Sequence, residues 1–107
     1  MSEQKTVTVT DSQGRKIEIR KLRALERMRL VELVGAQNAE NDRYLGYATL
    51  GYCVNSIDGN PVGTPGSKLA LESIVQELDD AGLDAVAKAI EDNFLPKKSD
   101  EGALKNG

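Results

Sequence analysis

The sequence predicts an α+β protein that is mainly α, with a β-hairpin over residues 5–20 followed by about four helices over residues 22–95. Two patterns predict this class. The first segment alternates apolar and polar side chains on both sides of a turn, which is the period of a strand. The remainder repeats its apolar residues every three or four positions, which is the period of a helix.

A single domain is expected, because 107 residues is the usual length of one. We expect this globular domain to comprise residues 1–95. Residues 96–107 (PKKSDEGALKNG) are polar and show no periodicity, so a disordered tail is predicted there.

The predicted hairpin depends on two pairs of β-branched residues around a turn. Val7 and Val9 precede the polar segment 11–14 (DSQG), and Ile17 and Ile19 follow it. Two strands alone are only marginally stable in water. The hairpin must therefore pack on helices, or pair with another strand or another subunit.

Two helices are predicted next, over residues 22–34 and about 41–55. Gly35 is placed to end the first of them with a positive φ, and the polar residues 38–42 could cap the second. The second has an uncharged middle, typical of an element covered on several sides, and its glycines suggest close approach of a neighbouring backbone. The first helix carries an apolar stripe of Leu22, Leu25, Met28, Val31 and Val34. The second carries Tyr44, Tyr47 and Tyr52.

A turn-rich loop over residues 56–66 separates these helices from two more. Asp58-Gly59-Asn60-Pro61 within it favours a small hairpin. A third helix is predicted over 68–78. A fourth begins after the break at 79–80, and Pro96 ends it.

The composition argues against an enzyme. The chain has no histidine, which is the commonest general base and metal ligand, and no motif for a catalytic, metal or cofactor site is present. The single cysteine, Cys53, cannot form a disulfide within the chain, which favours a reducing compartment. Neither a signal peptide nor an apolar segment long enough to cross a membrane is visible, so we expect a cytosolic protein.

Charge is segregated along the chain. Residues 15–29 contain seven basic side chains against two acidic ones, and residues 72–92 contain seven acidic ones against a single lysine. Two solvated faces, or pairing of the first and last helices, would explain this. The alternative is that the basic and acidic surfaces meet head to tail between subunits. Such charged contacts fix the register of the subunits more than they add binding affinity. The side chains assigned to such contacts are Arg20, Arg23, Arg27, Glu77, Asp80 and Asp84.

Five short motifs follow one another in a fixed order. They are residues 19–22 (IRKL), 22–28 (LRALERM), 41–44 (NDRY), 57–62 (IDGNPV), and the Leu-Asp step at 78–79 that leads into the last helix, to residue 90. This order resembles the tail assembly chaperones of long-tailed bacteriophages and related prophages, over about residues 6–95.

The resemblance implies a non-enzymatic protein without cofactors that binds the phage tape measure protein and keeps its apolar helices soluble during tail assembly. It implies work in the host cell cytoplasm and absence from the mature virion. The major tail protein and further copies of the chain are additional candidate partners. Nucleic acid and membrane are not expected ones. The side chains assigned to client binding are Leu25, Met28, Val31, Tyr44, Tyr47 and Tyr52.

Two other functions stay open at this stage. A small regulatory protein could bind nucleic acid through the basic segment 15–29, although the acidic half would repel a polyanion. A structural head–tail joining protein is the other alternative, which would be found in purified virions.

Overall fold

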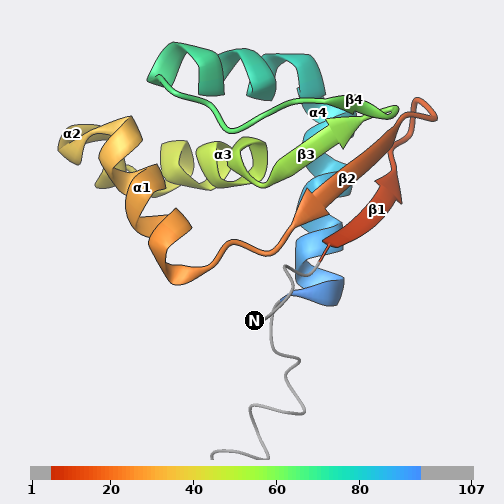
Figure 1. Cartoon of the computed structure of the whole chain (residues 1–107), viewed down its shortest axis with the longest axis horizontal. Coiled ribbons are helices and arrows are strands. Elements are labelled where there is room, and N and C mark those ends of the chain that lie inside the picture. Colours follow the sequence, from red (N-terminus) through yellow and green to blue (C-terminus); the bar gives the residue numbers. More distant parts are fainter. Residues whose placement is uncertain (1–5, 95–107) are drawn as a thin grey trace, which may run out of the picture.

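The computed structural model describes residues 6–94, which form a four-stranded antiparallel sheet and four helices (Figure 1). The predicted α+β class, with a hairpin followed by helices, is confirmed. The predicted tail, 96–107, lies outside the described residues. The elements are β1 Thr6–Thr10, β2 Lys16–Arg20, α1 Ala24–Val34, α2 Ala36–Ala39, α3 Asp42–Tyr52, β3 Val54–Ile57, β4 Asn60–Pro61 and α4 Lys68–Asn93.

The N-terminal hairpin forms as predicted, with Val7 opposite Ile19 and Val9 opposite Ile17. Ile17 and Ile19 are fully buried, while the two valines of the edge strand are partly buried against the same core. The hairpin gains its stability from a neighbouring strand, β3, and from α4, which packs against β1 and β2 (Figure 1).

Strand β3 corrects the predicted end of the second helix. The helix was expected to continue to Asn55, but α3 ends at Tyr52 and the next residues pair with β2. The β-branched Val54 and Ile57 are buried in this strand, where such side chains fit a sheet better than a helix. The register shifts between Glu18 and Ile19, so the pairing contains a bulge.

The small hairpin predicted at Asp58-Gly59 is confirmed. Asp58 and Gly59 have φ of 52° and 81°, and two positive φ values define the two-residue turn whose twist matches a hairpin. The Asp58 carboxylate also accepts a hydrogen bond of 2.8 Å from the amide of Lys16, which ties this turn to β2.

The linker between the first two long helices differs from the expected one. Gly35 has the predicted positive φ, but its ψ of 154° is extended, and the chain enters the short helix α2 directly. Asn41 then caps α3, because its side-chain oxygen accepts hydrogen bonds from the amides of Arg43 and Tyr44. A neighbouring backbone was expected beside the two glycines of α3. Gly46 instead has no neighbouring atom where a side chain would project, and Gly51 lies against the side chain of Val75.

Helix α4 is bent, as the predicted break at 79–80 required. Asp79 has φ 56° and ψ −171°, a region otherwise almost confined to glycine, which costs about 1–3 kcal/mol. The first arm, 68–78, lies over α3, and the second arm, 80–93, covers β1 and β2 (Figure 1). The core lies between these layers.

Cys53 is buried at the end of α3, and its environment predicts low reactivity. Its side chain is 1% exposed, and burial raises the pKa of the thiol to about 12. We expect Ellman's reagent at pH 8 to modify the folded protein negligibly, because the thiolate is the reactive form. The same reagent in guanidinium should titrate one thiol per chain. Rapid modification of the folded protein would contradict this placement.

Candidate functional site

An apolar row points outward from α1. Leu25, Met28 and Val31 are 55%, 68% and 43% exposed. On the opposite side of the helix, Leu30 and Val34 are buried in the core. Large exposed side chains in such a row are typical of a protein-binding surface.

The predicted stripe of α1 therefore divides between two environments. Leu22 and Val34 join the core, whereas the three residues between them face solvent. In a helix each residue advances by about 100°, so residues 25, 28 and 31 span one side and residues 30 and 34 the other. The accessible half of the stripe is called the α1 row below.

The three tyrosines of α3 occupy three different environments. Tyr47 is 51% exposed. Tyr44 is half-buried, and its hydroxyl donates a 2.8 Å hydrogen bond to Glu72 of α4. Burial, followed by this bond and the charge of Glu72, raises the pKa of Tyr44. Tyr52 is 4% exposed and belongs to the core, so its assignment to a partner-binding surface is corrected.

Tyr44 and Tyr47 line a small depression between α3 and the first arm of α4. Its volume is about 170 Å³, and Ala48, Glu72 and Val75 complete its walls. The α1 row lies in a separate, open depression formed by α1 alone. The structure therefore does not join the tyrosines and the α1 row into one groove.

Arg20 was assigned to a subunit contact, and its position corrects that assignment. The side chain is buried, with Nε donating to Glu26 at 2.9 Å and Nη1 donating to Asn55 at 2.8 Å. Its guanidinium also lies 5.7 Å from the centre of the Tyr52 ring, within cation–π distance. Arg20 is thus an internal structural residue.

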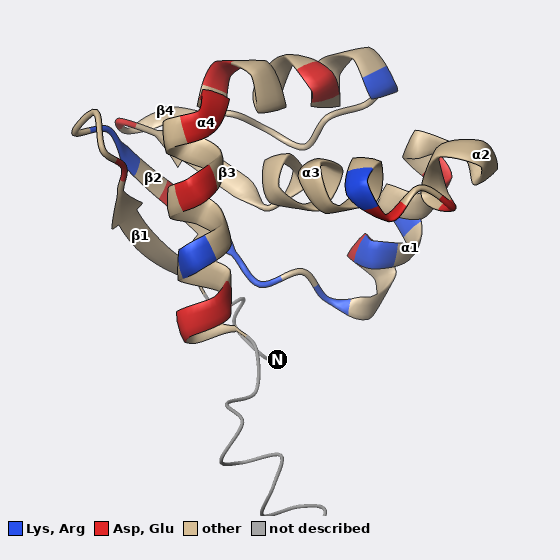
Figure 2. Cartoon of the chain, turned by 180° about the vertical axis from the view of Figure 1, so that it is seen from behind, with Lys and Arg blue, Asp and Glu red and all other residues tan. Residues whose placement is uncertain are grey.

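The other residues assigned to subunit contacts are exposed: Arg23, Arg27, Glu77, Asp80 and Asp84. In Figure 2 the ribbon is coloured for basic residues on α1 and on the segment before it, and for acidic residues at several positions along α4. Acidic residues outnumber the two lysines along α4, whereas α1 itself carries two arginines and two glutamates, so the basic excess lies mainly before α1. Arg27 also donates to the carbonyl of Leu22 at 2.7 Å, which fixes the start of α1.

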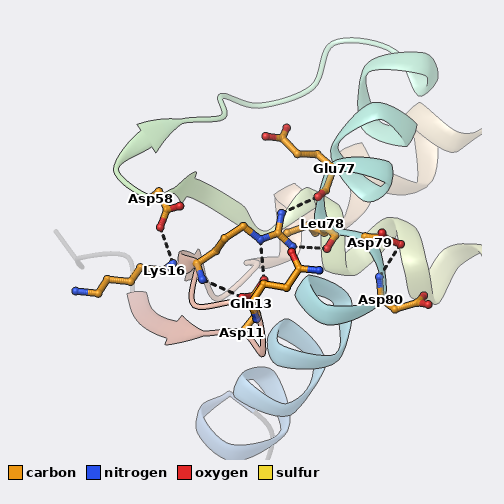
Figure 3. A network of polar contacts seen from close by, with 9 residues as sticks. Asp11, Gln13, Lys16, Asp58, Glu77, Leu78, Asp79 and Asp80 are labelled. Carbon is orange, nitrogen blue, oxygen red and sulfur yellow. Dashed lines mark hydrogen bonds and ion pairs between the residues drawn. The ribbon is translucent and has the colours of Figure 1, made fainter.

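A polar network that the sequence patterns did not predict links the first hairpin turn to the bend of α4 (Figure 3). The Asp11 carboxylate is buried and accepts bonds from the amides of Gln13 and Arg15 and from Nε of Arg15. Arg15 then donates from Nη1 to the carbonyl of Glu77 at 2.8 Å and from Nη2 to that of Leu78 at 2.7 Å.

This network fixes the charge of Asp11. Burial opposes ionisation, but the bonds from Arg15 and Gln13 and the positive charge of Arg15 outweigh it and lower the pKa of Asp11. Cations near the end of a helix interact favourably with its last carbonyls, so Arg15 stabilises the end of the first arm of α4. An Asp followed by an Arg four residues later is too common a pattern to have indicated this.

Within residues 6–94, no group of three or more potential metal-ligating side chains is found. No helix in the same part of the chain combines the length and apolarity needed to cross a membrane.

No protein-family model, curated protein or solved structure matches the chain. Three features of the described residues therefore bear on function: the α1 row, the depression at Tyr47 and the segregated charges.

Proposed function

We propose that this protein is a non-enzymatic tail assembly chaperone that binds the tape measure protein of a long-tailed phage or prophage. The sequence motifs from residue 19 to residue 90 support the proposal by their resemblance to that family. The observation that carries it is the α1 row, because a chaperone for apolar helices needs apolar surface that its own core does not use.

The chemistry of the row suits a helical client. Met28, the most exposed residue of the row, has a flexible thioether side chain that adapts to varied partners. Arg29 and Glu32 lie beside it on α1, and they provide a polar rim of both signs. An amphipathic client helix laid along α1 would bury its apolar face on the row and keep its polar face in water.

The remaining parts of the proposal follow from the same role. The protein would act in the host cell cytoplasm, be absent from the mature virion, and need no cofactor. The major tail protein and other copies of the chain are further proposed partners.

The α1 row can be tested by capture of the client. Met28→Asp should lower co-purification of the co-expressed tape measure protein at least tenfold, because a charge would be desolvated in the apolar contact. Leu69→Asp is the matched control, since Leu69 is 74% exposed on α4, outside the row. Leu69→Asp should leave capture unchanged, and both variants should keep the wild-type unfolding midpoint.

Equal capture by wild type and by a folded Met28→Asp variant would reject the row as the contact. Two further measurements address the rival functions. Salt-dependent binding to duplex DNA would favour nucleic acid recognition, although Arg15 and Arg20 of the basic segment are engaged internally. Detection of the protein in purified virions would favour a structural component.

A further inference from the structure

The bend of α4 replaces backbone hydrogen bonds with bonds from one side chain. In an uninterrupted helix the carbonyls of Glu77 and Leu78 accept from the amides of residues 81 and 82. Asp79 lies within the turn that each of these two hydrogen bonds would close. Because its dihedral angles are not helical, the bend breaks both bonds. Arg15 donates to these same two carbonyls. A straight α4 and the Arg15 contact are therefore alternative ways to satisfy the same acceptors.

Two local features are needed only by the bent form. Asp79 holds a backbone conformation that L-residues rarely adopt, and a straight helix would release it. Gly82 is buried in the bend, where an added Cβ would lie 2.9 Å from Cβ of Leu78 and 3.2 Å from Nη2 of Arg15. In a straight helix residues 78 and 82 are one turn apart, with Cβ atoms about 5–6 Å apart. A side chain at position 82 would then fit.

The second arm cannot leave the sheet without a replacement. Val86 and Ala89 of this arm are buried, as are Ile17 and Ile19 of the sheet that it covers. The same arm from another copy of the chain would offer identical contacts, and exchange of identical elements is a low-cost route to a dimer. No described element follows the second arm, so it can move without carrying another element of residues 6–94 with it.

We propose that Asp79 is the hinge of a domain exchange between two copies of this chain. Helix α4 straightens, its second arm packs on the sheet of the partner copy, and the partner's arm packs on the first copy. Arg15, held by Asp11, is the latch that favours the bent monomer. This inference does not depend on the proposed chaperone function.

The double variant Asp79→Ala, Gly82→Ala tests the hinge, because alanine favours a straight helix at both positions. We expect light scattering to give twice the 11.6 kDa monomer mass. For the distance measurement, cysteines introduced at Leu69 and Asp92 carry spin labels, and doubly labelled chains are diluted with unlabelled variant. The two labels of one chain should then lie about 35 Å apart, which is the length of 23 helical residues. The wild-type monomer should give a shorter separation. Asp79→Gly, which relieves the strain without removing the bend, should stay monomeric.

A monomeric variant, or a dimer with the short label separation, would overturn the proposal. Should the double variant fail to fold, the same labels in wild-type protein refolded at high concentration decide the question. A dimer fraction with the separation of about 35 Å would support exchange. Refolding that yields only monomers with the short separation would overturn it.

Discussion

Replacing Leu78 by alanine is expected to lower the free energy of unfolding by about 2–5 kcal/mol. Leu78 is fully buried at the end of the first arm of α4, where its side chain packs against Gly82. Truncation removes apolar contacts and leaves a cavity that the tightly packed bend cannot easily close. Urea denaturation followed by circular dichroism measures the effect.

Leu69→Ala is the matched control, since Leu69 lies on the same arm but is 74% exposed. Its free energy of unfolding should change by no more than about 0.5 kcal/mol. Similar losses in the two variants would show that Leu78 is not buried as described.

Replacing Arg20 by methionine is expected to lower the free energy of unfolding by about 1.5–3 kcal/mol. Methionine keeps much of the side-chain volume but removes the bonds to Glu26 and Asn55. The loss stays moderate because the Glu26 side chain is 26% exposed and can be rehydrated. Thermal or urea unfolding, compared at equal protein concentration, gives the difference.

Arg29→Met provides the control, because Arg29 is exposed on α1. It should leave the free energy of unfolding nearly unchanged. If Arg20 were instead a subunit contact, its replacement would change the oligomeric state more than the stability of the monomer.

Most of the fold could be predicted because its elements have strong local patterns. The β-branched alternation around Asp11 indicated the first hairpin, and Asp58-Gly59 indicated the second. Strand β3 was missed because it follows an apolar helix without a break, and the uncharged run offers no period to separate them. The local hairpin with β4 involves Ser56 and Ile57, and the pairing with β2, which is a tertiary contact, extends the strand back to Val54.

The candidate site was predictable only in part. Periodicity identified α1 as a helix. Leu30 and Leu33, however, lie outside the predicted stripe, so the helix has apolar side chains on more than one side. Which side of α1 faces the core depends on the helices that surround it, so the exposure of Met28 could not be deduced from its spacing. Tyr52 was assigned to a surface for the same reason, and packing places it beneath Arg20 in the core.

The contact between Arg15 and the carbonyls of residues 77 and 78 has a consequence for biosynthesis. Arg15 precedes Glu77 by 62 positions in the chain and Leu78 by 63 positions. The ribosome therefore completes the hairpin long before it releases the helix that covers Ile17 and Ile19. Contacts of such long sequence separation form late and slow folding, and the uncovered strands are prone to aggregate in the interval. A nascent chain of this protein must expose its own apolar strand until the second arm of α4 has been synthesised.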